Sequence, residues 1–495
     1  MVGLLLFFCC TTAPKEPVVP KNVLLIVVDT LRADYLEAYG APNKIAPNMN
    51  KWAKSSVVLT HHFATSSWTR PGFATLLTGK YPSEVGIYEE RFDRLAEDIE
   101  TLPEVLQQKG FSCLAINSNP NIDPYFGFAQ GFHTFVEADS RYTWMEGTKE
   151  EQEKIGQPLA SAEDIAQRTY TEIKKVKEPW FAMTVFIDPH KPYLPKEEDK
   201  KAVQNLPQKY HSEYAAEVHH ADRGVGSLLS KLEKEGVLED TLVIITSDHG
   251  EGLWSHPGVP HSFEHGNHLY DSVNHVPLIF WHKNLEAKQL DDLTSSISIY
   301  PTILDLLGMH DVHDAERPSL KRLIQDGVQK GLPEYVYAQT NWQRNEKFSI
   351  RSKDTRYVYS YDAWLFQKEK NVEGKLPLLE ETRKLLSGPI HELYTTSCTP
   401  LSFCWGDTSL KESWRTNAYS EHQHQSLEKR LQEWNAQVKK RIPEQRAEDD
   451  GISVFRIEGE NMIEERFVPH EWAEISPEMT PSMREQLKNL GYLDE

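Results

Sequence analysis

Five acidic and imidazole side chains follow closely after apolar runs of this sequence. They are Asp29, Asp188, His190, Asp248 and His249. In open α/β sheets, ligands bind outside the carboxyl ends of the strands, so we expect these side chains to converge on one crevice. Carboxylate and imidazole groups are ligands for Mg, Ca, Mn or Zn. A single Asp at a strand end often makes a turn or cap instead, but the whole set favours a site for one or two divalent metal ions.

A hydroxyl group is predicted to serve the same site. The stretch Ser67–Gly79 reads S-W-T-R-P-G-F-A-T-L-L-T-G, with Thr69 directly before Arg70 and Pro71. This order predicts a helix that has Thr69 as its N-cap, proline in its first turn and glycine near its end. The hydroxyl and the free backbone N–H groups would then point at one place, where the helix dipole favours an anion. A capping threonine without a chemical role is the alternative.

The elements that must position these groups follow from the hydrophobic pattern. Five runs are apolar without alternation, which is typical of strands covered on both faces of a parallel sheet. They are Val23–Val28, Phe111–Ile116, Trp180–Ile187, Leu242–Thr246 and Pro277–Trp281. Helical patterns occur at Pro47–Ser55, Leu102–Gly110, Asp164–Lys177 and Tyr214–Glu235. This alternation predicts an α/β fold with a central, mostly parallel sheet sandwiched by helices.

The pattern changes in the last third of the chain. Phe348–Tyr359 and Gly388–Tyr394 have strand-like content and predict a small antiparallel sheet, and we interpret the charged helix Ser426–Arg441 as a solvated face. A capping box predicts a last short helix near Ser482. We therefore expect a leader and linker over residues 1–21, an α/β domain that carries the site over 22–330, and a C-terminal subdomain with a small sheet and terminal helices over 331–495.

Composition and charge argue against a nucleic-acid partner. The 495 residues are 39% apolar and 10% aromatic, which suits a globular protein with a buried core. The formal net charge is -20 and the pI is near 5.5. Nucleic-acid binding needs clustered Lys and Arg side chains, and the sequence has no such cluster.

The first residues predict export. Met1–Cys10 is apolar but far too short to span a bilayer, and it is similar to the end of a secretory signal that lacks its basic part. Cys9 or Cys10, followed by the polar linker Thr11–Lys21, resembles a bacterial lipoprotein processing site. We expect a periplasmic or outer-membrane-associated lipoprotein, attached to the membrane through a lipidated cysteine. A frayed apolar N-terminus is the alternative.

Five short motifs, in this order, resemble the sulfatase family within the alkaline-phosphatase superfamily. The motifs are V-V-D-T-L-R-A-D-Y-L at Val27–Leu36, W-T-R-P-G-F-A-T-L-L-T-G at Trp68–Gly79, D-P-H-K-P-Y at Asp188–Tyr193, S-D-H-G-E at Ser247–Glu251 and H-G-N-H-L-Y-D at His265–Asp271. Each motif is weak alone, whereas five in the right order are strong. The resemblance covers nearly the whole chain and implies the alkaline-phosphatase-like α/β fold with a smaller C-terminal antiparallel sheet.

Together, the resemblance and the strand-end pattern suggest roles for particular residues. Thr69 falls where the family places its nucleophile, and His190 matches the histidine that contacts the transferred group or the leaving oxygen. The assignments are Asp29, Asp248, His249 and Thr69 for metal binding, Thr69, His190, His265 and Arg70 for catalysis, and Asn119 and Asp188 for substrate binding.

The departures from the sulfatase pattern affect the expected chemistry. Sulfatases have Cys or Ser, matured to formylglycine, at the position of Thr69, and an Arg at the position of Phe73. The second acidic ligand is replaced by Thr30, and the usual final Asn of the metal pair by His249. A secondary alcohol would not yield the required aldehyde, and the threonine-using relatives in the superfamily resemble phosphodiesterases and phospho-group transferases. Arg70 either replaces the missing cation or is a surface residue.

We therefore predict a metal-dependent hydrolase or transferase of sulfate- or phosphate-type esters. Thr69, activated by the ion, attacks phosphorus or sulfur, and His190 or His265 protonates the departing oxygen. In a variant of this prediction, Asp188, His190 and His265 hold a second ion. We favour phosphodiester or phosphonate esters, as small molecules or linked to glycans or lipids. The alternatives are a sulfuric ester hydrolase proper, or an inactive relative that binds metal and anions.

Overall fold

The computed structural model describes most of the chain. The described residues are 19–87, 93–137, 161–253, 264–311, 317–328, 331–342, 345–353, 355–360, 390–395, 421–441, 454–458 and 461–465. Met1–Cys10 and the helix expected near Ser482 lie outside these ranges, so the lipoprotein-like leader and the last helix stay predictions. No helix in the described ranges is long and apolar enough to cross a membrane.

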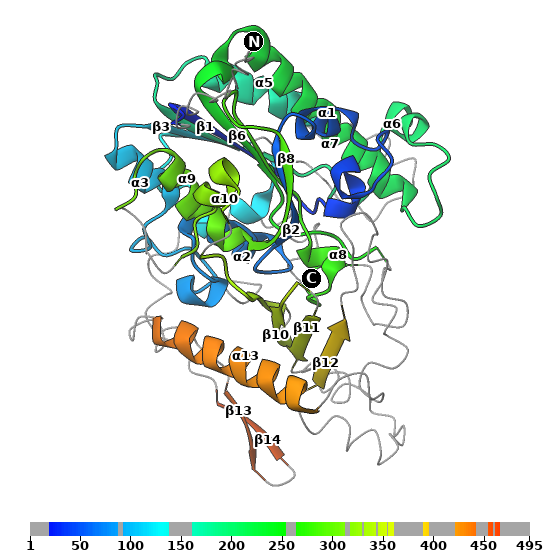
Figure 1. Cartoon of the computed structure of the whole chain (residues 1–495), viewed down its shortest axis with the longest axis vertical. Helices are drawn as coiled ribbons and strands as arrows, with labels where there is room; N and C mark the ends of the chain where they lie inside the picture. The colour runs from blue at the N-terminus through cyan, green and yellow to red at the C-terminus, as the bar shows by residue number, and fades with distance from the viewer. Residues whose placement is uncertain are drawn as a thin grey trace, which may run out of the picture.

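An eight-stranded sheet forms the centre of the molecule (Figure 1), and its strand order is β4-β3-β5-β1-β6-β7-β2-β8. In that order the strands are Thr134–Glu137, Ser112–Asn117, Trp180–Phe186, Asn22–Val28, Thr241–Thr246, Leu278–Trp281, Val57–Phe63 and Lys288–Ser295. The first five strands run parallel, β7 is antiparallel to both of its neighbours, and β2 and β8 are parallel to each other. The predicted mostly parallel sheet is confirmed.

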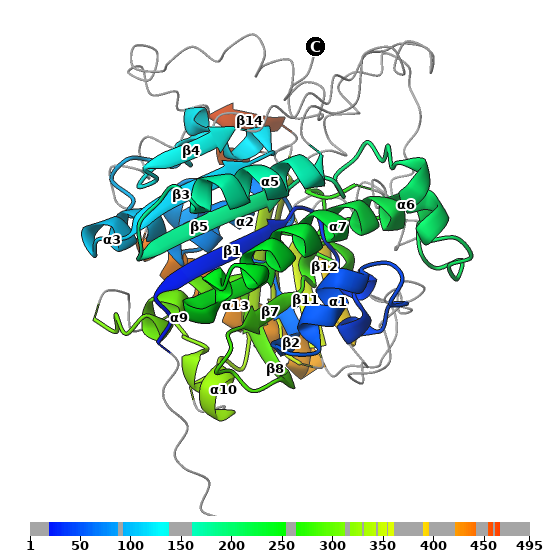
Figure 2. The same ribbon diagram turned by 90° about the horizontal axis from the view of Figure 1, so that it is seen from above.

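Both faces of the sheet are covered, which explains why β1 is apolar from Val23 to Val28. Val23, Leu25 and Val27 belong to one hydrophobic core, and Leu24 and Ile26 belong to the other. The first core includes side chains from α2 (Thr69–Thr78), α3 (Leu102–Gln108), α9 (Ile299–Leu306) and α10 (Lys321–Asp326). The second includes side chains from α1 (Pro47–Ala53), α5 (Ala162–Ile173) and α7 (Ser212–Lys234). Figure 2 shows α5 and α7 lying over the strands at the middle of the sheet.

Three strands of the central sheet were not predicted, and each differs from the continuous apolar pattern. β2 ends in the polar sequence T-H-H-F, β8 reads K-Q-L-D-D-L-T-S, and β4 has only four residues that are partly exposed. β8 and β4 are the two edges of the sheet, where one side of each strand has no neighbour to bury it. The short helices α6 (Glu197–Ala202) and α8 (Asp271–Asn274) were also not predicted.

A smaller antiparallel sheet follows the central one, as expected for this fold class. Its order is β12-β11-β10-β9, and its strands are Ile390–Thr395, Thr355–Ser360, Asn345–Arg351 and Val336–Trp342. Every neighbouring pair is antiparallel. A separate hairpin joins β13 (Val454–Glu458) and β14 (Asn461–Glu465). The division of the chain at residue 330 stays a prediction.

The helix α13 (Glu421–Arg441) is not the solvated helix that its charge indicated. Leu427, Leu431, Trp434 and Val438 are buried together with Tyr81, Ile297, Phe348 and Ile350. These four positions of α13 share one face at helical spacing. Figure 1 shows α13, in orange, beside the smaller sheet. The prediction was wrong because the many charged residues of the outer face mask a narrow apolar stripe.

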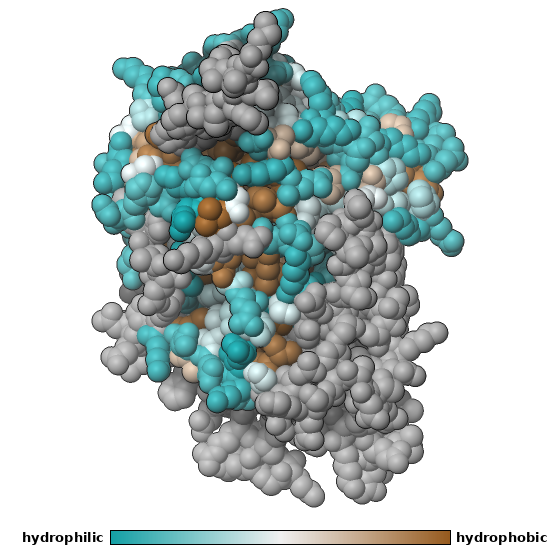
Figure 3. All heavy atoms as spheres, in the orientation of Figure 1, coloured by the Kyte–Doolittle hydropathy of each residue, from teal (hydrophilic) through white to brown (hydrophobic). Residues whose placement is uncertain are grey.

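The surface of the described part is predominantly polar. Hydrophilic side chains, in teal, cover much of the upper part of the face shown in Figure 3. Val19 and Leu194 are the two exposed large apolar side chains within the described ranges. Isolated apolar residues of this kind are normal on a globular protein and indicate no docking surface.

Replacing Trp434 by Ala should loosen α13 from the smaller sheet. Its ring is 4.7 Å from that of Tyr337 and 5.0 Å from that of Tyr81, centroid to centroid. Loss of a buried tryptophan costs about 3–5 kcal/mol, so limited proteolysis should cut the Trp434→Ala protein within the C-terminal region much faster than the wild type. Glu433→Ala changes a neighbouring exposed residue and should leave the cleavage rate unchanged. Equal cleavage of both variants would contradict this packing.

Candidate active site

Parallel pairing places Asp29 and Asp248 side by side. β1 pairs with β6 so that Val27 lies opposite Thr246, and each aspartate comes two residues later in its strand's continuation. β5 pairs with the other edge of β1, and the Asp29 N–H donates to the carbonyl of Phe186 at 2.8 Å. The carboxyl ends of these strands therefore deliver their side chains to one place, as the strand-end rule predicts.

Thr69 reaches the same place from α2, although not as the predicted N-cap. Trp68, in extended conformation, is the N-cap, and Thr69 is the first helical residue. Its hydroxyl Oγ1 lies 3.3 Å from Nε2 of His249. The helix can approach closely because Gly72 has no side chain, since a Cβ atom there would lie 2.8 Å from the carbonyl oxygen of Asp248. The hydroxyl thus faces the strand ends rather than closing its own helix.

Three acceptor groups face one another in the centre of the site. Ligand atoms of Asp29, Asp248 and His249 all lie within 4.8 Å of one another, and all three residues are buried. Nε2 of His249 is 3.6 Å from Oδ1 of Asp29 and 3.4 Å from Oδ2 of Asp248. Those two carboxylate oxygens have no hydrogen-bond donor. His249 Nδ1 donates to the carbonyl of Gly250 at 2.8 Å, so the lone pair of its neutral ring is on Nε2 and faces the carboxylates.

The ionisation of the site reflects this crowding. Burial, and then the charge of Asp248, raise the pKa of Asp29 well above its ordinary value. Burial also raises the pKa of Asp248 to about 7. Burial lowers the pKa of His249 below its ordinary value. A proton or a cation between these groups relieves the repulsion, and two carboxylates, an imidazole and a nearby hydroxyl suit a hard or borderline divalent metal ion.

Asn119 lies beside this cluster. Its Nδ2 donates a short hydrogen bond to Oδ2 of Asp29, and its Oδ1 accepts from the N–H of Asn121 at 2.8 Å. The Asn119 amide therefore orients the Asp29 carboxylate, and Oδ1 of Asp29 is left to face the acceptor cluster. This side chain was expected to contact substrate, and the structure adds the contact with Asp29.

Two further histidines extend the site from His249. The ring of His265 is 4.6 Å from that of His249 and 4.9 Å from that of His190, so the three imidazoles form a row. Burial, together with the neighbouring imidazoles, lowers the pKa of His190 and of His265 well below the ordinary value. Both rings are therefore neutral at pH 7, and an anionic ligand in contact with them would raise their pKa again.

Glu251 belongs to the site, although its place in the motif S-D-H-G-E predicted no role for it. It is buried, and its Oε1 and Oε2 lie 3.1 and 3.2 Å from Nδ1 of His265. Because Glu251 accepts a hydrogen bond from Nδ1 of His265, the other ring nitrogen of His265 is left on the side of the neighbouring imidazoles. The motif S-D-H-G-E contains this residue, but its spacing from His265 in the chain gives no sign of the contact.

Asp188 is engaged elsewhere than in the cluster of acceptors. Its Oδ1 accepts from the N–H of Ala162 at 3.2 Å and lies 3.4 Å from Nδ1 of His220 in α7. Within the described residues, Asp29, Asp248 and His249 are the one group with the spacing of a metal site. The structure therefore brings His190 and His265 together but does not bring Asp188 to them as a second metal site would require.

Arg70 is buried, so the interpretation as a surface residue was wrong. Its guanidinium carbon lies 3.9 Å from the ring centroid of Phe126, and its Nε donates to Oδ1 of Asn121 at 3.3 Å. Phe73, at the position of the sulfatase cation, is buried in the hydrophobic core. Arg70 is thus a cation beside Thr69 in the chain, held by an aromatic face and an amide.

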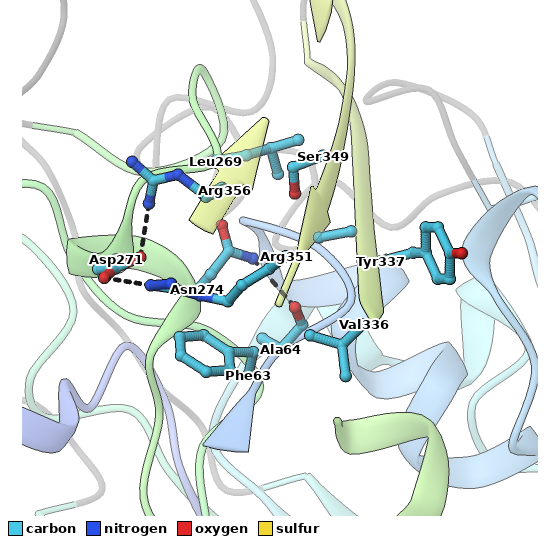
Figure 4. Close-up of a pocket in the computed structure, with 11 residues that line it drawn as sticks. Phe63, Ala64, Leu269, Asp271, Asn274, Val336, Tyr337, Ser349, Arg351 and Arg356 are labelled. Atoms are coloured by element: carbon cyan, nitrogen blue, oxygen red, sulfur yellow. Dashed lines mark hydrogen bonds and ion pairs between the residues drawn. The ribbon is translucent and has the colours of Figure 1, made fainter. Parts of the chain in front are cut away.

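The smaller sheet supports the segment that carries His265. Asp271 of α8 forms ion pairs with Arg356 of β11 at 2.5 Å and with Arg351 of β10. Figure 4 shows these three side chains where α8 meets the smaller sheet. Burial alone would raise the pKa of Asp271, but the two guanidinium groups bring it below its usual range. The carboxylate is therefore charged at neutral pH, and the pairs hold α8 against the sheet.

The same helix supports the loop before Thr69. Nδ2 of Asn274 donates to the carbonyls of Ala64 and Ser66, each at 3.1 Å. Ser67 and Gly266 join the two loops directly, because the Gly266 N–H donates to the Ser67 carbonyl at 2.8 Å and the Ser67 hydroxyl donates to the Gly266 carbonyl at 2.9 Å. The segments that carry Thr69 and His265 are therefore fastened to each other.

Comparison with known proteins gives a consistent result. A family model described as Sulfatase matches residues 21–309. A sulfatase from Formosa agariphila is 25% identical over 437 residues, which cover 73% of this chain and 84% of that protein. A solved protein in complex with its substrate D-glucosamine-2-N,6-O-disulfate has a TM-score of 0.66 at 17% identity, covering 86% of this chain and 100% of that one. A phosphonate monoester hydrolase from Silicibacter pomeroyi has a TM-score of 0.58 at 18% identity, with coverages of 91% and 100%.

Metal titration should separate the one-ion from the two-ion arrangement. Asp29→Asn and Asp248→Asn each remove a charge from the cluster, and we expect Mn²⁺ affinity to fall by more than about 100-fold in isothermal titration calorimetry. Asp188→Asn changes a buried aspartate outside the cluster, so the number of Mn²⁺ ions bound per chain should stay at that of the wild type. Loss of one of two bound ions in Asp188→Asn would support the two-ion arrangement instead.

Metal binding should strengthen as the pH rises through about 7. A metal ion must displace the protons that Asp248 and Asp29 bind below their raised pKa values, so affinity should rise by up to about tenfold per pH unit for each proton displaced. Without metal, the stability contributed by protonated Asp248 is complete below its unfolded pKa of about 3.9 and is lost as the pH rises through about 7.

Thermal denaturation with and without Mn²⁺ measures both effects. The metal-free melting temperature should be lower at about pH 8 than at about pH 6, and the increase caused by saturating Mn²⁺ should be larger at the higher pH. A metal-induced increase that is the same at both values would contradict the predicted competition between proton and metal.

Proposed function

The chain belongs to the sulfatase family of the alkaline-phosphatase superfamily, and from this premise we propose that it is a metal-dependent ester hydrolase or transferase with Thr69 as its nucleophile. The observation that carries the proposal is the position of the Thr69 hydroxyl, 3.3 Å from Nε2 of His249 at the edge of the buried acceptor cluster. A hydroxyl in this position replaces the matured residue of the sulfatase pattern.

Asp29, Asp248 and His249 would hold the ion, because their facing acceptor atoms match its ligand preferences. When bound, a divalent ion lowers the pKa of a neighbouring hydroxyl and offsets negative charge on the transferred group. Asn119 keeps the Asp29 carboxylate in place. The raised pKa of each carboxylate means that ion binding and proton release go together.

The chain's own residues supply the remaining steps. Thr69 Oγ1 releases its proton to solvent and attacks phosphorus or sulfur in line with the leaving oxygen, and the N-terminal N–H groups of α2 stabilise the charge on the equatorial oxygens. His265, oriented by Glu251, or its neighbour His190 takes up a proton from solvent when the anionic substrate raises its pKa, and then gives this proton to the departing oxygen. Water, or an acceptor alcohol in the transferase case, then attacks the Thr69 ester and restores the hydroxyl.

Phosphodiester or phosphonate esters are the substrates that the site favours. Thr69 cannot become the aldehyde of a sulfatase, because it is a secondary alcohol. The likeness to a phosphonate monoester hydrolase supports the same class. The solved relative that binds D-glucosamine-2-N,6-O-disulfate supports an anionic group linked to a sugar. We therefore propose a phosphorus-centred ester linked to a glycan as the substrate class, and aryl esters report the chemistry first.

One observation favours a second candidate. Phe73 is fully buried in the hydrophobic core, so no cation stands at the sulfatase position. A relative that binds metal and anions without turnover would tolerate this change. The burial of Arg70 favours an active enzyme over an inactive relative, because Arg70 places a buried cation one residue after Thr69.

An ester panel tests the proposal. Purified protein is stripped of metal, supplied with Mg, Mn, Ca or Zn, and assayed on aryl phosphodiesters, aryl phosphonate esters, aryl phosphates and aryl sulfates. We expect metal-dependent turnover of the diester or phosphonate, with kcat reduced at least about a thousandfold in Thr69→Ala. Thr69→Ser keeps a hydroxyl and should retain measurable turnover.

Thr78→Ala is the matched control for the loss of a hydroxyl from α2. The Thr78 hydroxyl donates to the carbonyl of Ala74 at 2.6 Å, away from the acceptor cluster, so its removal should leave kcat unchanged. Undiminished turnover in Thr69→Ala would refute the nucleophile, and turnover of sulfates alone would make the protein a sulfuric ester hydrolase. Metal-dependent anion binding without turnover of any ester would identify the inactive relative.

A further inference from the structure

The turn after β1 contains a backbone conformation that its residue type disfavours. Thr30 has a φ of 57°, and within the described ranges Asn205 and Leu253 are the other non-glycine residues with positive φ. A β-branched residue is an outlier in this left-handed region, because its side chain crowds the backbone. Such a conformation persists only where surrounding contacts determine it.

The hydroxyl of Tyr214 makes two of these contacts. Its Oη donates to the carbonyl of Thr30 at 2.6 Å and accepts from the N–H of Arg32 at 3.0 Å, so one phenol bridges both sides of the turn. Tyr214 lies in the first turn of α7 and is fully buried. The rings of Tyr35 and Tyr193 pack edge-on against it at centroid distances of 4.6 and 5.8 Å. The hydroxyl therefore has a fixed position.

The turn at Thr30 also contacts a carboxylate of the acceptor cluster. Asp29 directly precedes Thr30, and the Thr30 N–H is 3.4 Å from Oδ1 of Asp248. Oδ2 of Asp248 is left to face His249. The Thr30 N–H belongs to the peptide that joins Asp29 to Thr30, and the φ of Thr30 sets the angle at which the rest of the turn, which Tyr214 holds, leaves this peptide. The left-handed conformation of Thr30 is thus the one in which the turn held by Tyr214 and the N–H at Oδ1 of Asp248 occur together.

A second contact holds the turn from the side of β6. The Leu31 N–H donates to Oγ of Ser247 at 3.0 Å, and the Ser247 hydroxyl donates to the carbonyl of His249 at 2.5 Å. This contact ties the turn to the metal-binding segment but leaves the Thr30 carbonyl untouched. The hydroxyl that holds the carbonyl is that of Tyr214.

We propose that Tyr214 is a positioning residue for the metal site, whose hydroxyl holds Thr30 in the left-handed conformation and thereby keeps the Thr30 N–H at the carboxylate of Asp248. The residue acts through the backbone and touches neither ion nor substrate. Its place in α7, far from Thr30 in the chain, makes the first turn of this helix part of the site. The inference rests on the metal site of the proposed function.

Tyr39 provides a matched control. Its hydroxyl donates to the carbonyl of Leu59 at 3.0 Å and accepts from the N–H of Leu278 at 2.9 Å, and its side chain is buried. Tyr39→Phe therefore removes the same pair of hydrogen bonds as Tyr214→Phe, at a place without contact to the acceptor cluster.

The test is Mn²⁺ affinity of the full chain, measured by isothermal titration calorimetry for variants shown to be folded by circular dichroism. Tyr214→Phe should weaken binding about tenfold, the usual size of an effect exerted through a ligand's support, and Tyr39→Phe should change it less than about twofold. Equal affinity in wild type and Tyr214→Phe, or an equal loss in both variants, would overturn the proposal. Absence of Mn²⁺ binding by the wild type would refute the metal site itself.

The double variant Thr30→Gly/Tyr214→Phe tests the route of the effect. Glycine adopts positive φ without penalty, so in the Thr30→Gly background the loss caused by Tyr214→Phe should shrink to less than about threefold. An undiminished tenfold loss would show that the hydroxyl does not act through Thr30. Should Tyr214→Phe alone fail to fold, the double variant must fold and bind Mn²⁺ nearly as well as Thr30→Gly, and its failure to do so overturns the proposal.

Discussion

Repulsion among three buried acceptors is the constraint on which this structure depends. Asp29, Asp248 and the Nε2 side of His249 face one another, and Oδ1 of Asp29 and Oδ2 of Asp248 have no hydrogen-bond donor. Burial of such groups is costly unless a proton or a metal ion joins them. The rest of the site is arranged to keep the acceptors in place, although burial raises the pKa of both carboxylates.

The central sheet and its helices share this work. Parallel pairing of β1 with β5 and β6 brings the strand ends to one edge, and Gly72 lets α2 approach that edge with Thr69 at its first position. On the other face, α7 holds Thr30 through Tyr214 and contacts Asp188 through His220. Helices from both hydrophobic cores therefore reach the site.

The smaller sheet also takes part. Its residues Arg351 and Arg356 hold Asp271, and the short helix that contains Asp271 supports the loops on which Thr69 and His265 lie. These contacts join segments that are far apart in the chain around one charged carboxylate. Within its described residues, the smaller sheet thus holds these loops without supplying a ligand to the acceptor cluster.

The sequence by itself determined the sheet, its main strands and the acidic and imidazole residues at their ends, because hydrophobic continuity and residue type are local properties. It also predicted Thr69 at the position where sulfatases have their nucleophile. Only the tertiary structure decided that Asp188 turns to His220, that Glu251 holds His265, and that α13 is buried on one face. Each of these outcomes depends on which distant segment lies within hydrogen-bonding or packing distance, and spacing along the chain does not specify that.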